Sequence, residues 1–292
     1  MSDNPYYKYL ESLGSCYEEA SNVDLTNLPE PKKYFINESA PKVVLLAPHP
    51  DDECVMGGLP LRLYREAGCR VVTLPVTLGS NPDRKKERME ELRQACQYLG
   101  FKLEEICPEG LNEIHPSGKK NNPKNWEKSI DLLSHSLNQL EPDLIFFPNS
   151  NDWNQTHLGV NLLTLESLSH ISADTFTLIE TEFWGQMPRP NLLVESSRSD
   201  LTDLISALSF HRGEVERNPF HLRLPFWMQD NVRRGAEVIG GQGEVAPNFN
   251  FATPYRVTRV QNGNFQEPWQ GGRMLPSKKD GDRSLIDQLI ST

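Results

Sequence analysis

The sequence predicts an α/β fold, in which a doubly wound, mostly parallel sheet carries helices on both faces. Three observations predict it: short apolar runs recur along the chain, longer charged or amphipathic segments separate them, and glycine or proline closes several of these segments. Strands that alternate with helices are typical of parallel sheets. Right-handed crossovers then bring the carboxyl ends of the strands to one edge of the sheet.

The expected elements follow one another from about residue 42. We expect strands at residues 43–47, 70–77, 102–106, 143–147 and 175–183, with a further strand at 191–195. Helices are expected at 55–68, 82–99, 125–140, 157–170 and 199–212. Gly100 follows the second of these helices and is expected to be its C-cap, because glycine adopts the left-handed conformation without strain.

The organisation of the chain is predicted to be simple. Residues 1–40 are interpreted as an N-terminal extension and residues 41–292 as a single catalytic domain. From about residue 213 we expect irregular C-terminal additions, because proline, glycine and aromatic residues break the periodic pattern. The stretch 268–282, rich in Gly, Lys and Pro, is expected to be loose.

Composition restricts the class of partner and the compartment. The net charge of −10 argues against a nucleic acid partner, which would need a basic face. No segment reaches the run of about 18 apolar residues that would span a bilayer, and the polar residues 1–8 lack the apolar region of a signal peptide. The five cysteines are scattered without Cys-x-x-Cys, which indicates free thiols. We therefore expect a cytoplasmic protein, and a homo-oligomer is compatible with the sequence.

A group of ionisable residues directly follows the first predicted strand. His49, Asp51, Asp52 and Glu53 come after the apolar residues 43–47, at the edge where open α/β sheets place their sites. Imidazole and carboxylate are ligands of catalytic zinc, so one Asp could bind a metal while the other acts on water. The alternative is an acidic, solvated loop with a surface histidine. We favour the metal site, because desolvated like charges need a compensating cation.

A third metal ligand is expected from another strand end. A catalytic zinc usually has three protein ligands. The strand at 143–147 ends in a polar run that leads to His157 at the start of the next helix, in the same topological place as His49. The alternative for His157 is a solvent-facing histidine at a helix N-terminus. Among the other histidines, His211 is the one that we keep as a candidate site residue.

These motifs resemble those of the PIG-L/LmbE-like zinc-dependent de-N-acetylase family. The family pattern has an apolar strand followed by His-Pro-Asp-Asp-Glu, here from His49 to Glu53. A Thr-containing second strand follows, here 71–77, and then a helix with Arg-x-x-Glu-Leu-x-x-Ala and a final Leu-Gly, here from Arg88 to Gly100. A late histidine corresponds to His157. The resemblance extends over roughly residues 42–212.

The resemblance implies a Rossmann-like sheet, one zinc ion per chain (or another divalent ion), and hydrolysis of an N-acetyl group from an N-acetylglucosamine-type sugar or its conjugate. It implies that His49, Asp52 and His157 hold the metal and that Asp51 is the general base. Glu53 would be structural. Arg88 would contact substrate, the alternative being one charge on an exposed helix.

The chain departs from the family pattern at two places. The family often has His-x-x-His where this chain has Asn154 before His157, and His-x-Ser-Gln where this chain continues from His211 as His-Arg-Gly-Glu. Asn154 can donate a hydrogen bond to an oxyanion but cannot titrate, so we expect a catalytic role without acid function. The amine proton would then come from Asp51 or another group. Asp152 and His211 are expected to bind substrate.

Three other functions are alternatives to this interpretation. A zinc amidase for a non-sugar N-acyl substrate would use the same centre, and a catalytically silent carbohydrate-binding or partner-binding module would keep the fold. A nucleotide-binding protein is disfavoured, because no Gly-x-Gly-x-x-Gly follows the first strand. The expected partner is therefore a small-molecule amino sugar or glycoconjugate.

Overall fold

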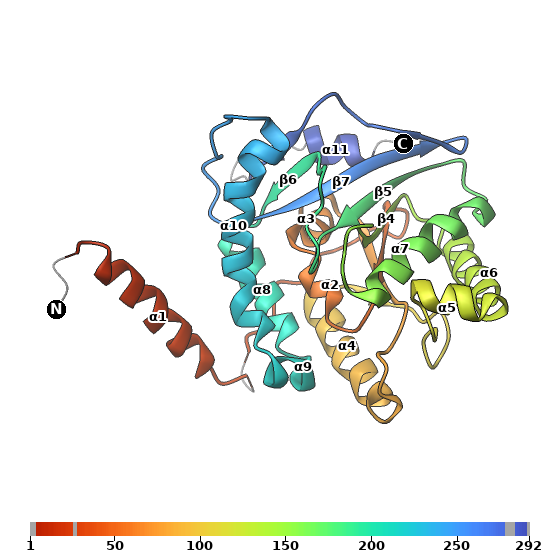
Figure 1. Ribbon diagram of the computed structural model, residues 1–292, viewed down its shortest axis with the longest axis horizontal. Coiled ribbons are helices and arrows are strands. Elements are labelled where there is room, and N and C mark those ends of the chain that lie inside the picture. Colours follow the sequence, from red (N-terminus) through yellow and green to blue (C-terminus); the bar gives the residue numbers. More distant parts are fainter. Residues whose placement is uncertain (1–3, 26–27, 278–283, 291–292) are drawn as a thin grey trace.

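The computed structural model describes residues 4–25, 28–277 and 284–290, and it contains one mixed sheet covered by helices on both faces (Figure 1). The strands lie in the order β3-β2-β1-β4-β5-β7-β6-β9, and β8 pairs with β7. The predicted fold class, a doubly wound and mostly parallel α/β sheet, is confirmed.

The parallel half of the sheet consists of the first five strands. These are β1 (Lys42–Ala47), β2 (Arg70–Pro75), β3 (Lys102–Leu103), β4 (Leu144–Pro148) and β5 (Thr175–Thr181). Side chains alternate between the two faces of a strand. In β1, Val43 and Leu45 pack into one apolar core, whereas Val44 and Leu46 pack into the other. Because both faces are covered, the strand is a continuous apolar run.

The helices form two layers. On one side of the sheet lie α3 (Gly58–Ala67), α4 (Lys85–Leu99) and α8 (Arg198–Leu208), and on the other side lie α5 (Pro116–Asn121), α6 (Pro123–Leu140) and α7 (Gln155–Ser167). Short helices precede or follow these, namely α2 (Asp52–Val55), η1 (Pro82–Arg84) and η2 (Leu168–His170). Within the described residues, no helix combines the length and the apolar character needed to cross a bilayer.

Two glycines explain where these helices begin and end. The helix expected at 55–68 is divided into α2 and α3 at Gly57, whose φ is +91°. A Cβ atom on Gly57 would lie 2.4 Å from Thr253 Oγ1, so the close approach of the two segments requires glycine. Gly100 ends α4 in the left-handed conformation, with φ +81°, and its predicted role as C-cap is confirmed.

The N-terminal residues form a helix that extends away from the sheet. Helix α1 (Tyr7–Ser21) has no buried residue, and it contacts α10 (Phe220–Gly240) (Figure 1). This arrangement is compatible with the expected N-terminal extension, and the division of the chain at residue 41 stays a prediction.

The C-terminal part of the chain is more regular than expected. After residue 211 it forms α9 (Arg212–Arg217), α10, β7 (Ala252–Gln261), β8 (Asn264–Gln266), β9 (Arg273–Leu275) and α11 (Ser284–Ile290). Strand β7 lies inside the sheet, antiparallel to both β5 and β6 (Leu192–Glu195). Buried Leu224, Met228 and Val232 recur every fourth residue of α10, a helical period that Pro225 and the aromatic residues obscured. The loose stretch expected at 268–282 includes β9, and residues 278–282 lie outside the described part.

The order of the strands fixes the place of the site. From β1 the chain crosses to β2 on one side, and from β4 it crosses to β5 on the other. The loops that leave the carboxyl ends of β1 and β4 therefore diverge, and ligands of open α/β sheets bind in the crevice between such loops. These two loops carry the predicted metal ligands.

Candidate metal centre and active site

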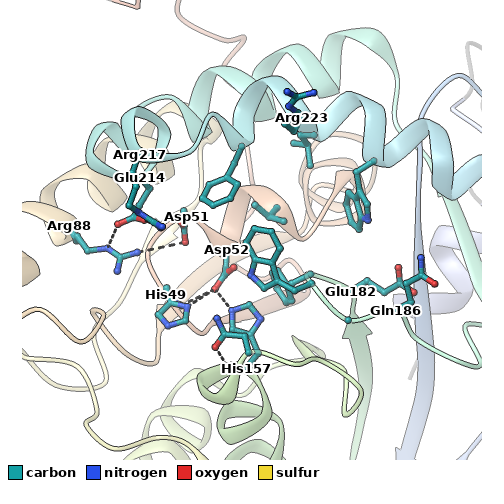
Figure 2. Close-up of a pocket in the computed structure, with 18 residues that line it drawn as sticks. His49, Asp51, Asp52, Arg88, His157, Glu182, Gln186, Glu214, Arg217 and Arg223 are labelled. Carbon is teal, nitrogen blue, oxygen red and sulfur yellow. Dashed lines mark hydrogen bonds and ion pairs between the residues drawn. The ribbon is translucent and has the colours of Figure 1, made fainter. Parts of the chain in front are cut away.

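The structure brings the three predicted metal ligands together. His49 follows β1, Asp52 is the first residue of α2, and His157 lies in the first turn of α7. Asp52 Oδ2 lies 3.4 Å from His49 Nδ1 and 3.3 Å from His157 Nε2 (Figure 2). One nitrogen or oxygen of each residue lies within 4.8 Å of the others. The backbone N–H of His49 donates to Asp52 Oδ2 (2.9 Å), which holds the turn between β1 and α2.

The chemistry of this trio fits a divalent metal ion. Both ring nitrogens of His157 are buried, and neither has a hydrogen-bond partner among the described residues. A buried polar atom normally has a partner, and Nε2 points toward the carboxylate of Asp52. Two imidazoles and one carboxylate are also a ligand set that catalytic zinc uses, with one coordination position left open.

The electrostatic field at the trio favours a cation. Burial alone would lower the pKa of His157, but the carboxylates of Asp52 and Asp152 outweigh it and raise this pKa to about 10. Burial alone would raise the pKa of Asp52, but His157 and His49 outweigh it and hold this pKa far below its usual value. The carboxylates of Asp52 and Asp152 thus favour a positive charge at the buried ring of His157.

Asp152, which the sequence predicted to bind substrate, lies behind His157 and not on the pocket wall. Its side chain is 0% exposed and does not line the pocket, and its Oδ2 lies 3.4 Å from His157 Nδ1. The same oxygen accepts hydrogen bonds from the backbone N–H groups of Trp184 (3.1 Å) and Gly185 (3.4 Å). A carboxylate behind a metal-binding imidazole fixes the ring and makes it more basic. The loop after β4 and the first turn of α7 thus contain both a candidate ligand, His157, and the carboxylate behind it.

Asp51 is held in an unusual backbone conformation. Its φ is +120°, which costs conformational energy in a residue other than glycine. The peptide group between Pro50 and Asp51 is fixed at both ends: its N–H donates to Glu53 Oε2 (2.9 Å), and its carbonyl accepts from Arg88 Nη2 (2.8 Å). The Asp51 carboxylate lies 3.8 Å from the same guanidinium and lines the pocket (Figure 2). Arg88 therefore lies at the pocket, and its contact with substrate stays a prediction.

Burial, together with the nearby Asp52, raises the pKa of Asp51 well above its usual value. A carboxyl group with increased proton affinity is suited to take a proton and to return it.

His211, which was also expected to bind substrate, lies away from the pocket wall. It is completely buried, and its Nε2 lies 2.7 Å from Glu53 Oε1. Neither residue lines the pocket, so the pair lies behind Asp51 and cannot contact a substrate directly. Sequence position placed His211 near the site, but the direction of the side chain depends on how α8 and α9 meet.

Asn154 has a capping role and also faces the pocket. Its Oδ1 accepts hydrogen bonds from the backbone N–H groups of Thr156 (2.9 Å) and His157 (3.4 Å), which caps α7. The residue lines the pocket. The cap uses only the oxygen of the amide, and no described residue accepts a hydrogen bond from its Nδ2. Both interpretations of Asn154, cap and oxyanion donor, are thus compatible with its geometry.

The pocket has a volume of about 470 Å³ and includes residues that were not predicted from the sequence. They come from the end of β5, from α9 and from α10: Glu182, Phe183, Trp184, Gly185, Gln186, Glu214, Arg217, Phe220, Arg223, Leu224 and Trp227. Glu182 and Trp184 follow β5 at the same sheet edge, so the rule that identified the loops after β1 and β4 could have found them. The residues of α9 and α10 had no such signal, because this segment was expected to be irregular.

Comparison with known proteins agrees with this fold. The family model described as GlcNAc-PI de-N-acetylase (PIG-L) matches residues 44–168. Among solved structures, teicoplanin deacetylase Orf2 in its zinc-inhibited form has a TM-score of 0.55 at 12% identity, over 75% of this chain and 98% of that one. N,N'-diacetylchitobiose deacetylase from Pyrococcus horikoshii has a TM-score of 0.50 at 17% identity, over 90% and 96%. No curated protein sequence matches the chain.

A third structure shares the fold but is named for a different reaction. GalB, the 4-carboxy-2-hydroxymuconate hydratase from Pseudomonas putida KT2440, has a TM-score of 0.53 at 16% identity, over 75% of this chain and 95% of that one. Identities this low show the fold alone, and a fold can carry several chemistries.

Fold and site together define a doubly wound α/β protein with a candidate metal centre at the switch point of the sheet. More particularly, the resemblance to the PIG-L/LmbE-like family is confirmed, with residues 44–168 as the matched region.

Proposed function

We propose that this protein is a zinc-dependent hydrolase that removes the N-acetyl group from an N-acetylglucosamine-type amino sugar or its conjugate. The observation that carries the proposal is the trio of His49, Asp52 and His157 beside the fixed carboxylate of Asp51, at one end of a pocket. The match to a family described as a de-N-acetylase supports the reaction. The solved deacetylases named for teicoplanin and for diacetylchitobiose support a sugar-containing substrate.

The proposed roles follow from where each side chain lies. His49, Asp52 and His157 would hold the zinc ion, and a zinc ion bound there supplies Lewis-acid chemistry toward the amide carbonyl and toward water. Asp152 keeps the ring of His157 in the orientation that presents Nε2. Asp51, Asn154 and Arg88 also line the pocket, and they are the residues that we propose to act on the substrate.

The hydrolysis itself needs one proton to move twice. Asp51 takes a proton from the attacking water, and the water oxygen forms a bond to the acetyl carbon. Asn154 Nδ2 donates a hydrogen bond to the oxygen of the tetrahedral intermediate. When the bond between carbon and nitrogen breaks, Asp51 returns the proton to the amine, and acetate and the free amino sugar leave. Arg88 keeps the carboxylate of Asp51 in place and borders the substrate.

The location and partners proposed from composition complete this description. We propose a cytoplasmic enzyme whose partner is a small-molecule amino sugar or glycoconjugate.

Acetate release by the zinc-loaded protein from a panel of N-acetylated compounds tests the proposal. The panel contains N-acetylglucosamine, its glycosides, and N-acetylated amino acids and amines of similar size. We expect acetate from the N-acetylglucosamine compounds. Release from the non-sugar amides alone would favour the amidase, and binding of sugars without any release would favour the catalytically silent module.

A further inference from the structure

The pocket continues beyond the metal trio along an aromatic wall, which we define as Trp184, Phe220 and Trp227. The rings of Trp184 and Phe220 are in edge contact, with centroids 5.2 Å apart and planes at 62°. Trp184 is 48% exposed although it borders a pocket. All three residues lie outside the family-matched region 44–168.

The wall is fixed relative to the metal trio. The backbone N–H groups of Trp184 and Gly185 donate to Asp152, whose carboxylate also faces His157 Nδ1. A Cβ atom on Gly185 would lie 2.2 Å from the carbonyl oxygen of Asn151, so the two loops are packed as closely as glycine permits. The segment that carries Trp184 is therefore attached directly to the loop that supplies a metal ligand.

The other side of the wall is also anchored. Helix α10 carries Phe220 and Trp227, and its Arg234 forms a two-point ion pair with Glu182 at the end of β5 (2.9 and 3.0 Å). Glu182 is buried at the pocket. An aromatic surface that is held on both sides loses little conformational entropy on binding a ligand.

The arginines around the pocket already have partners within the protein. The part of a ligand that lies away from the metal trio would therefore be bound mainly by apolar contact. Arg217 forms an ion pair with Glu214 (2.6 Å), and Arg88 is engaged with the Pro50 carbonyl. Arg223 lies at the end of the pocket away from His157 (Figure 2), and its guanidinium carbon lies 4.3 Å from the centroid of the Tyr17 ring. An acetamido group fills only a small part of a pocket of about 470 Å³, a size typical of sites for drug-sized ligands.

We propose that the aromatic wall is a subsite for an apolar or aromatic group attached to the amino sugar, on the side away from the acetamide. The inference rests on the proposed deacetylase function. It restricts the proposed substrates to N-acetylglucosaminides that carry an apolar aglycone. Burying such a group against Trp184 removes apolar area of both partners from water.

Phenyl and methyl β-glycosides of N-acetylglucosamine test the subsite, because they differ only in the group that the wall would contact. For the zinc-loaded wild type we expect kcat/KM to be about tenfold higher with the phenyl glycoside, the size of effect that aromatic contact and apolar burial give. Trp184→Ala should remove this preference, so that the ratio of kcat/KM between the two glycosides falls to about one. Trp153→Ala is the matched control, since Trp153 belongs to the adjoining loop, is 69% exposed and does not line the pocket.

Two results would overturn the subsite. Equal kcat/KM for the two glycosides in the wild type would show that the wall does not contact the aglycone. An equal loss for both glycosides in Trp184→Ala would show that it contacts the sugar ring instead. If Trp184→Ala does not fold, Phe220→Leu gives the same test, because it keeps apolar volume and removes the ring that contacts Trp184.

Binding measurements separate this inference from the proposed function. Absence of acetate release from every N-acetylglucosaminide overturns the deacetylase, and the dissociation constants from titration calorimetry still test the wall. Tighter binding of the phenyl glycoside to the wild type and to Trp153→Ala, but not to Trp184→Ala, supports the subsite. Binding of the phenyl glycoside that is no tighter than that of the methyl glycoside overturns it.

Discussion

His211 and Glu53 form a completely buried ion pair directly behind Asp51, with His211 Nε2 2.7 Å from Glu53 Oε1. The other oxygen of Glu53 accepts the backbone N–H of Asp51, the residue with φ +120°. Glu53 thus connects a buried histidine of the α8–α9 junction to the backbone of the proposed base. Through this hydrogen bond the buried pair positions the backbone of Asp51. We therefore expect the pair to affect both stability and turnover, although it does not contact the substrate.

The ion pair predicts a specific dependence of stability on pH. Burial alone would lower the pKa of His211, but Glu53 outweighs it and raises this pKa, while His211 lowers the pKa of Glu53. The contribution of His211 is complete below its unfolded pKa of about 6.5 and is lost as pH rises through the raised folded value. The contribution of Glu53 is present above about 4.3 and is lost as pH falls through its lowered value.

His211→Gln tests this dependence, because glutamine keeps hydrogen-bonding capacity but cannot carry charge. Removing one partner of a buried pair costs about 3–5 kcal/mol, and we expect a loss of this order in the free energy of unfolding at about pH 5–6. The difference from the wild type should become smaller as pH rises above about 6.5. Urea unfolding at several pH values measures it. A difference that stays constant up to pH 9 would show that His211 is neutral in the folded protein.

Asp152→Asn should weaken metal binding. The change removes the charge behind His157 Nδ1 while it keeps the shape of the side chain. Loss of such a supporting carboxylate typically costs 10–100-fold in metal affinity, and we expect a loss of roughly this size in a chelator competition experiment. Asp143→Asn is the control. Asp143 Oδ2 accepts a hydrogen bond from the backbone N–H of Lys42, at the edge of the sheet opposite to the candidate metal centre. If the metal affinity of Asp152→Asn equals that of the wild type, the Asp152 carboxylate does not support His157, and packing alone orients the ring.

Asn154 requires two substitutions, because its side chain both caps α7 and faces the pocket. Asn154→Ser keeps a good N-cap oxygen but not the amide donor, whereas Asn154→Ala loses both. We expect Asn154→Ala to lose about 1 kcal/mol of stability and Asn154→Ser to stay near the wild type. Both should lower kcat by roughly 10²–10³-fold with metal content unchanged, if the amide stabilises the oxyanion. A normal kcat in Asn154→Ser would restrict Asn154 to capping.

Asp51→Asn should separate turnover from metal binding. The carboxylate lies in the pocket but outside the trio, so the variant should keep its metal. Turnover should fall by roughly 10²–10⁴-fold, the usual contribution of a general base. Steady-state acetate release and metal analysis on the same preparation measure both effects. A variant with nearly the wild-type rate would exclude Asp51 as the base.

The parallel half of the fold could be predicted because its signals are local. Strands β1, β2 and β4 are short, mostly apolar runs, each followed by a helix, and Gly100 marks a helix end. The positions of His49, Asp52 and His157 followed from one rule, that loops after neighbouring parallel strands meet at the same sheet edge. That rule needs no knowledge of side-chain directions.

The remaining features depend on contacts between distant residues. Strand β7 pairs with β5 through residues such as Tyr255 and Thr181, far apart in the chain, and no local pattern encodes that partner. Whether Asp152 faces the substrate or His157 depends on the backbone of its loop, which the sequence does not specify. The wall on α10 escaped prediction because Pro225, which the helix tolerates, indicated a break.

Metal content tests the central claim most directly. Inductively coupled plasma mass spectrometry of the purified protein, after addition of zinc and removal of the excess, should find about one zinc per chain. His157→Ala should lose most of it, whereas His135→Ala should keep it, since His135 is exposed on α6 and belongs to no candidate metal group. A wild-type protein that holds no divalent ion, and binds none when zinc is added, would contradict the metal centre and the hydrolytic function proposed from it.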